Sequence, residues 1–199
     1  MNLYSKIKRR IIIYSRKITT VLGKISLKLN GVKYGSDLKI SGLIKVYNEG
    51  IIEIGDKVTI NSAMWANPIS ASSRTCFQVS GGFLKIGDGT GISNLFITCQ
   101  KKVEIGNNVL IGANCQIFDT DFHPLESRYR YGILKDNERI RRAEIFIEDG
   151  AFIGTGCIIL KGTHIGKGSV IGAGSVVSGY IPENEIWAGV PARFIKKVE

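Results

Sequence analysis

The sequence predicts an all-β fold of stacked coils, because one apolar pattern recurs every six residues from Val103 onward and is interrupted only once. Side chains alternate between the two faces of a strand, so a period of six cannot describe one helix face and instead describes short strands joined by turns. Short repeats of this kind bury their apolar face on the next coil. The aliphatic positions are Ile105, Ile111, Ile117, Ile147, Ile153, Ile159, Ile165, Ile171 and Val177.

A second inward position lies two residues before each aliphatic one, on the same strand face, and is usually small. It is occupied by Val109, Cys115, Ala151, Cys157, Thr163, Ser169 and Ser175. Glycine often follows the aliphatic residue directly, where we expect the turn backbone to take positive φ. These glycines are Gly106, Gly112, Gly154, Gly166 and Gly172.

Earlier segments, Ile52–Ile60 and Leu84–Ile92, follow the same pattern less regularly. The spacing between them is not a multiple of six, which predicts a loop at about 65–82. We therefore divide the chain into an N-terminal helix at 1–30, a β-helix at 31–186 with loops at about 65–82 and 124–143, and a C-terminal segment at 187–199.

Length, charge and cysteine content limit the classes of protein. A chain of 199 residues can bury a core of its own. A net charge of +10 favours phosphate-bearing ligands, anionic polysaccharide or membrane. Nucleic acid is disfavoured, because the basic groups are not interleaved with aromatics in a recognition motif. The four cysteines include no CxxC pair and are expected to be buried thiols of a cytoplasmic protein.

Residues 1–30 differ from the repeat. Apolar residues occur there at three- and four-residue spacing among Lys and Arg, which predicts a basic amphipathic helix. Two alternatives remain open for this helix. In the first, the helix docks peripherally on an anionic membrane surface. In the second, it packs on the β core or on a neighbouring subunit.

His123 marks the one break in the repeat. Six residues after Ile117 the pattern calls for an aliphatic residue and finds His123, with Asp121 in the preceding small slot. A carboxylate and an imidazole buried there would cost several kcal/mol, so the chain is expected to leave the coil and return at Ile145 or Ile147. Long excursions from compact domains are more often functional than not, and a nearby acid can orient a catalytic ring.

The second histidine serves as an internal comparison. His164 lies between two inward residues, Thr163 and Ile165, and is expected to point outward to the surface. Because the chain has only two histidines, a three-histidine zinc site cannot be built, and we expect no metal.

Several motifs together resemble the hexapeptide-repeat acyltransferases. They are the repeat itself, Asp119–Pro124 (DTDFHP), Ile147–Gly154 (IEDGAFIG), Ile171–Val177 (IGAGSVV) and Trp187–Lys196 (WAGVPARFIK). The resemblance covers roughly residues 50–197. It is greatest to the sugar O-acetyltransferases related to the maltose, galactoside, O-antigen and capsule enzymes.

This resemblance implies a left-handed parallel β-helix with three hexapeptides per coil, assembled as a homotrimer with active sites between subunits. It also implies direct transfer from acetyl-CoA to a sugar hydroxyl, with His123 as general base, because a neutral imidazole is the ordinary base at neutral pH. Asp121 is the expected orienting acid, with Asp119 or Glu138 as alternatives.

Other roles follow from matching positions in the family. Asn94 is expected to contact the acceptor, with a turn asparagine as the alternative reading. Arg128 and Arg130, in the excursion, are expected on the acceptor side. The expected coenzyme A contacts are Gly154, Thr155, Ala173, Ser178, Arg193 and Lys196, where cations suit phosphates and the Thr155 amide meets the thioester carbonyl.

The chain departs from the maltose and galactoside enzymes in its short basic N-terminus and in the loop at 65–82. These departures favour a cell-surface polysaccharide or its precursor as acceptor. We expect a cytoplasmic protein, because the longest apolar run of the basic N-terminus, Ile11–Ile13, is too short for a signal peptide or a membrane span; peripheral contact with the inner face of the membrane is the alternative. Two alternatives stay open: N-acetylation of an amino sugar nucleotide, and a non-catalytic β-helical scaffold or binding module.

Overall fold

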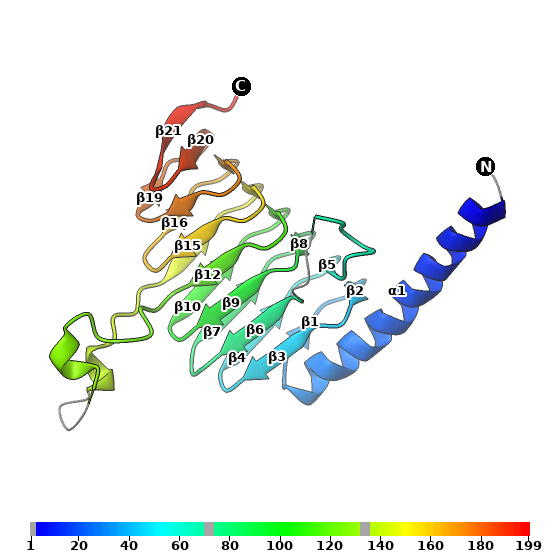
Figure 1. The fold of residues 1–199 in the computed structure, drawn as a ribbon, viewed down its shortest axis with the longest axis horizontal. Coiled ribbons are helices and arrows are strands. Elements are labelled where there is room, and N and C mark those ends of the chain that lie inside the picture. The colour runs from blue at the N-terminus through cyan, green and yellow to red at the C-terminus, as the bar shows by residue number, and fades with distance from the viewer. Residues whose placement is uncertain (1–2, 70–73, 132–135) are drawn as a thin grey trace.

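The computed structural model describes residues 3–69, 74–131 and 136–199, and it confirms the predicted left-handed parallel β-helix. Strands from successive coils stack into three sheets, and up to β20 every third strand along the chain joins the same sheet. The stack of coils, the helix beside its first coil and the protruding excursion are seen in Figure 1.

Each sheet is built from one side of every coil. The first sheet contains β1 Lys33–Tyr34, β4 Ile51–Ile54, β7 Phe83–Ile86, β10 Lys102–Ile105, β13 Ile145–Ile147, β16 His164–Ile165 and β19 Tyr180–Ile181. The second contains β2 Lys39–Gly42, β5 Thr59–Ser62, β8 Gly91–Ser93, β11 Leu110–Ile111, β14 Phe152–Ile153, β17 Val170–Ile171, β20 Glu185–Gly189 and β21 Ala192–Lys197. The third contains β3 Lys45–Asn48, β6 Cys76–Val79, β9 Phe96–Cys99, β12 Gln116–Phe118, β15 Ile158–Leu160 and β18 Val176–Val177.

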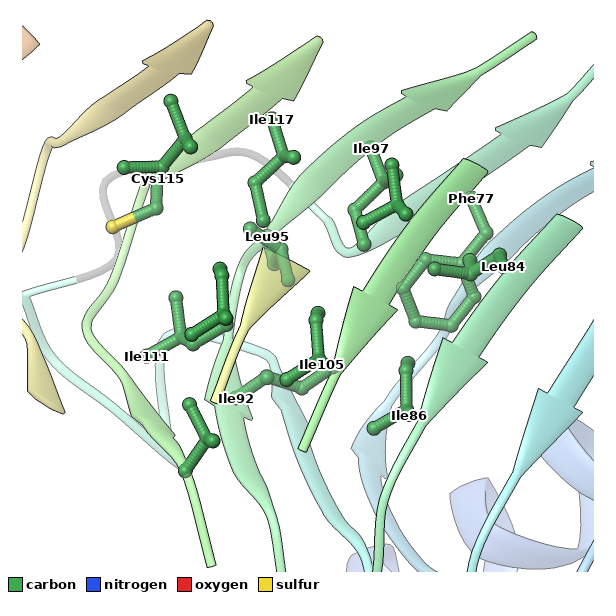
Figure 2. Packing of buried hydrophobic residues seen from close by; sticks show 14 of the residues in the cluster. Phe77, Leu84, Ile86, Ile92, Leu95, Ile97, Ile105, Ile111, Cys115 and Ile117 are labelled. Carbon is green, nitrogen blue, oxygen red and sulfur yellow. The ribbon is translucent and has the colours of Figure 1, made fainter. Parts of the chain in front are cut away.

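The inward positions of the repeat form the core. Ile105 pairs with Ile147, Ile111 with Ile153 and Ile117 with Ile159, so the aliphatic residues stack in columns. The small inward residues of the sequence prediction are all buried as well. Figure 2 shows this packing, with isoleucines from three sheets converging on the axis. Each fully buried aliphatic side chain contributes about 1.5–3 kcal/mol, which explains how such short strands persist.

All four cysteines are buried and free, as the repeat predicts for Cys115 and Cys157. Burial raises the pKa of the Cys99 thiol to about 12, and the neighbouring negative charge of Asp119 adds to the effect. A thiol of that kind is a packing group rather than a nucleophile.

The glycines that follow the aliphatic residues do not have the positive φ that the sequence predicts. Positive φ occurs two residues later, at positions such as Asn114 and Gly156. Gly112 and Gly154 are needed for a different reason: a Cβ there would lie 2.6 Å from the Thr155 nitrogen and 2.5 Å from the Ala173 nitrogen. The glycines allow successive coils to approach closely at the corner.

The loop expected at about 65–82 is shorter than the sequence predicts. Strand β6 occupies the second half of that range and pairs with β3 and β9 on either side. Phe77 on this strand is fully buried and pairs with Ile97, so part of the predicted loop belongs to the core. In the described part of this range, residues 65–69 and 74–75 lie outside the strands, and residues 70–73 are not described.

Helix α1, Leu3–Leu29, lies beside the first coil and contacts mainly β2. Leu27 is fully buried in the core, and Gly23 allows the helix to approach Ile40, which a Cβ would meet at 2.5 Å. At the opposite end, β20 and β21 form an antiparallel hairpin. None of the helices in the described ranges has the length and apolar character needed to cross a bilayer.

Candidate active site

The chain leaves the coil directly after β12, at Asp119. This carboxylate is fully buried and accepts hydrogen bonds from the amides of Gln100 (2.8 and 3.0 Å), Lys101 (2.6 Å) and Lys102 (3.0 Å). Its oxygens are therefore occupied in holding the corner of the preceding coil. The alternative that Asp119 orients His123 is disfavoured by these contacts.

A tight turn presents His123 at the root of the excursion. The His123 amide donates to the Asp121 carbonyl at 2.7 Å, and Phe122 between them has a φ of +62°. That conformation is uncommon for a bulky residue and is held here by two contacts. The Phe122 amide donates to Thr120 Oγ1 at 3.1 Å, and the Phe122 ring packs edge-on against Phe118. Strained backbone of this kind is concentrated at functional sites.

His123 is exposed and lines a cavity of about 550 Å³. Within the described residues, its ring makes no hydrogen bond, so both ring nitrogens are available to a substrate or to a second copy of the chain. The cavity is lined by Asp121, His123, Pro124, Leu125, Arg130 and Tyr131.

Asp121 lines the same cavity, and its described partner is Lys161. Asp121 Oδ1 lies 2.7 Å from Lys161 Nζ, while Oδ2 is buried without a partner in the described part of the chain. The sequence interpretation missed Lys161. The register between coils could have indicated Lys161. Phe118 pairs with Leu160, and this pairing brings the residues that follow both strands together.

The root of the excursion is closed by Gln100, which the sequence interpretation also missed. Its Oε1 accepts from Arg142 Nε at 2.8 Å and Thr120 Oγ1 at 3.2 Å, and Thr120 and Arg142 form an antiparallel bridge. The two ends of the excursion are therefore tied together, which fixes His123 relative to the coils.

Two 3-10 turns, η1 Ser127–Tyr129 and η3 Asn137–Arg139, order the described parts of the excursion. Arg130 donates to the Leu125 carbonyl at 2.9 Å and lines the cavity, whereas Arg128 stacks on the Tyr129 ring at 4.7 Å. Glu138 is exposed on η3, outside the cavity lining. Residues 132–135 lie outside the described chain.

Some of the residues expected to meet coenzyme A or the acceptor lie at a different corner, between the second and third sheets; these are Asn94, Gly154, Thr155 and Ala173. Asn94 lies there in a left-handed turn (φ +44°), buried, with its amide donating to the Asn61 carbonyl. Within one chain it does not line the His123 cavity. Its geometry matches that of a turn asparagine.

Thr155 lies at the same corner, in the turn between β14 and β15. Its hydroxyl donates to the Ala113 carbonyl at 2.6 Å, and the amides of Gly154 and Gly156 donate to carbonyls of neighbouring coils. Among the described residues, the Thr155 amide itself has no acceptor. A rigidly held amide of this kind can stabilise an oxyanion.

The remaining expected coenzyme A contacts are exposed and lie further along the chain. Ala173 occupies the Thr155 position of the next coil, and Ser178 follows β18. Arg193 and Lys196 lie on β21, where Lys196 pairs with Glu199 at 3.5 Å. One chain therefore does not bring the predicted coenzyme residues and His123 together.

His164 lies on the outer face of the first sheet, as the sequence predicts. Its Nε2 lies 2.7 Å from Glu148 Oε1, and its ring contacts the rings of Phe146 and Tyr180. In the described part of the chain, no group of three His, Cys, Asp or Glu side chains is placed to hold a metal ion.

Comparison with known proteins identifies the repeat. The family described as "Bacterial transferase hexapeptide (six repeats)" matches residues 144–179, and "Hexapeptide repeat of succinyl-transferase" matches residues 102–117. No curated protein matches the chain in sequence. These matches identify hexapeptide repeats of the transferase type in two parts of the β-helix.

Solved structures extend the comparison. A hexapeptide-repeat-containing acetyltransferase from Vibrio cholerae, complexed with acetyl coenzyme A, is 32% identical with a TM-score of 0.55, and the alignment covers 62% of this chain and 65% of that one. A galactoside acetyltransferase in complex with coenzyme A is 31% identical with a TM-score of 0.55, covering 71% and 64%. In both cases the match spans just under two thirds of the relative's length.

A third structure shows the fold alone. A mutant of AntD, an N-acyltransferase from Bacillus cereus in complex with dTDP and coenzyme A, is 22% identical with a TM-score of 0.67, and 87% of each chain is covered. The two structures above 30% identity confirm the resemblance to acetyltransferases, including the sugar O-acetyltransferase type.

Proposed function

We propose that this protein is an acetyl-CoA-dependent O-acetyltransferase that modifies a sugar hydroxyl of a cell-surface polysaccharide or its precursor. The observation that carries the proposal is His123, presented by a strained turn into a cavity at the one break in the repeat. The acetyl coenzyme A and coenzyme A complexes of the two relatives above 30% identity support the donor.

In the proposed reaction, a His123 ring nitrogen accepts the proton of the sugar hydroxyl while the hydroxyl oxygen attacks the thioester carbonyl. The carbonyl oxygen becomes an oxyanion, for which the Thr155 amide is the proposed donor. When the intermediate collapses, the C–S bond breaks and the leaving thiolate takes the proton from the imidazolium. No covalent enzyme intermediate is required.

The separation of the two groups of residues within one chain supports a site shared between copies. His123 follows the third sheet, while Thr155 and Asn94 lie at the corner before it. In a homotrimer, the His123 corner of one copy would face the coenzyme corner of the next. The mass of the protein in solution tests this arrangement.

An acceptor screen tests the activity. We expect thiol release from acetyl-CoA that depends on an added saccharide, with a product that mild alkali hydrolyses because it is an ester. An alkali-stable product would instead indicate the alternative, N-acetylation of an amino sugar nucleotide. Absence of thiol release across a broad acceptor panel would favour a non-catalytic scaffold.

Arg193 and Lys196 provide a prediction for the donor end. Replacing both by Ala should raise the KM for acetyl-CoA far more than it lowers kcat, because phosphate contacts are equally present in the ground and transition states. The difference from wild type should shrink as salt is raised. The matched variant Arg128→Ala/Arg130→Ala should instead change chiefly the kinetics with an anionic acceptor. If this variant raised the KM for acetyl-CoA while the Arg193/Lys196 variant did not, the donor and acceptor ends of the site would be the reverse of those proposed.

Asp121 is proposed to orient the His123 ring, since both line one cavity and Asp121 Oδ2 has no partner in the described chain. Asp121→Asn should lower kcat less than loss of the histidine does, through ring orientation. Lys161→Met removes the ion pair but keeps the Asp121 carboxylate, so it separates the effect of the ion pair on kcat from the effect of the carboxylate. Wild-type kcat in Asp121→Asn would assign the orienting role to another acid.

A further inference from the structure

Helix α1 docks on the β-helix through a face made of polar and small residues. Arg16 Nε donates to Ser41 Oγ at 2.7 Å, and the hydroxyls of Thr19 and Thr20 donate to the Ile40 carbonyl at 3.0 and 2.8 Å. Gly23 and the buried Leu27 continue this face toward the end of the helix. At 3.6 residues per turn, these positions follow one stripe along the helix.

The opposite side of α1 carries an apolar stripe that nothing in the described chain covers. At about 100° per residue, Ile18 and Ile25 lie roughly half a turn around the helix from Thr20 and Gly23. Every member is 48% exposed or more. The apolar stripe consists of Ile7, Ile11, Tyr14, Ile18, Val21, Leu22 and Ile25.

The charge of the helix is of one sign. Leu3–Leu29 contains eight Lys or Arg residues and no Asp or Glu. Arg10, Lys17 and Lys24 are seven residues apart and so form a row along one edge of the apolar stripe.

The coils do not obstruct this face. Because the β-helix contacts α1 from the opposite side, and only along its C-terminal half, the first turns of the helix extend away from the coils (Figure 1). A broad surface could therefore approach the apolar stripe along its whole length.

Charge decides between the two occupants that fit an exposed apolar face. A second copy of α1 would bring eight more cations and no carboxylate to neutralise them. An anionic lipid surface supplies both a hydrocarbon region, into which the apolar stripe can insert, and negative charge. Each Lys or Arg near such a surface strengthens binding. Since the helix cannot span a bilayer, it would lie in the plane of the interface.

We propose that α1 is a peripheral membrane anchor, which inserts the apolar stripe into an anionic lipid surface while the β-helix stays on the water side. This inference uses only α1 and its contacts, and it stands independently of the proposed acetyl transfer.

Vesicle sedimentation of the full chain tests the anchor. We expect the protein to sediment with vesicles of phosphatidylcholine mixed with phosphatidylglycerol, to bind phosphatidylcholine alone weakly, and to dissociate as salt is raised. Ile11→Gln/Ile18→Gln should lower the apparent affinity by at least about 10-fold, because two buried apolar side chains are lost. Glutamine retains helix propensity, and circular dichroism checks the fold.

Matched variants elsewhere on the surface separate the anchor from general stickiness. Ile51→Gln/Leu110→Gln changes two strand residues with exposure similar to that of Ile11 and Ile18, and it should bind as wild type does. Arg10→Glu/Lys17→Glu should abolish the preference for anionic vesicles, whereas Lys45→Glu/Lys197→Glu, with the same change in net charge, should reduce it only slightly.

Three outcomes would overturn the proposal. They are absence of wild-type binding to anionic vesicles, equal losses in the helix variants and their matched controls, and a change in oligomeric mass caused by Ile11→Gln/Ile18→Gln in lipid-free solution. The last result would make the apolar stripe a contact between protein chains.

Discussion

His123→Ala is expected to lower kcat by at least about 10²-fold, because general-base assistance is typically worth 10² to 10⁴. The Kd for coenzyme A should stay close to that of wild type, since the ring is proposed to accept the proton of the sugar hydroxyl and not to hold the coenzyme. Steady-state kinetics with acetyl-CoA and the acceptor found by the screen, together with calorimetry for coenzyme A, measure the two quantities separately.

The second histidine offers a control with the same change of side chain. His164 is held by Glu148 on the outer face of the first sheet, so His164→Ala should leave kcat unchanged. Substantial acetyl transfer by His123→Ala would refute the general-base role. Equal losses in both variants would indicate a general loss of structure.

The coils were predictable because each hexapeptide contains the full apolar pattern within its own six residues. Ile111, Ile153 and their equivalents fall at fixed spacing, and each is buried in register with the next. The role of Gly154 was not predictable in this way. Its constraint comes from the coil above, and two glycines of one corner look alike in sequence whether they need positive φ or close approach.

The site was predictable only in part. His123 stands out because it violates a strict repeat, and a violation is visible in one sequence. Lys161 and Gln100 could not be found so easily, because they meet the site across coils. Identifying them requires the register on both sides of an excursion whose length the repeat does not set.

Asp119 illustrates the same limit, because in sequence it looks like another candidate acid beside His123. In the structure, its carboxylate takes the place of water as the hydrogen-bond acceptor of three backbone amides at the corner where the excursion begins. Hydrogen bonds to a charged acceptor contribute more to the stability of the fold than hydrogen bonds between neutral groups. Amides that lose this acceptor lose that stabilisation. The residue therefore acts on folding, through the preceding coil.

We accordingly expect Asp119→Ala to lower the free energy of unfolding by about 3 kcal/mol, because partial access of water at the corner offsets some of the lost bonds. For a chain of this size, that loss corresponds to a fall in Tm of roughly 10 °C, measurable by calorimetry. Asp149→Ala is the matched control. That exposed carboxylate accepts from the Asn107 amide, and its loss should cost less than about 1 kcal/mol. If Asp119→Ala unfolds at the wild-type temperature yet loses turnover, the acid that serves His123 is Asp119 rather than Asp121.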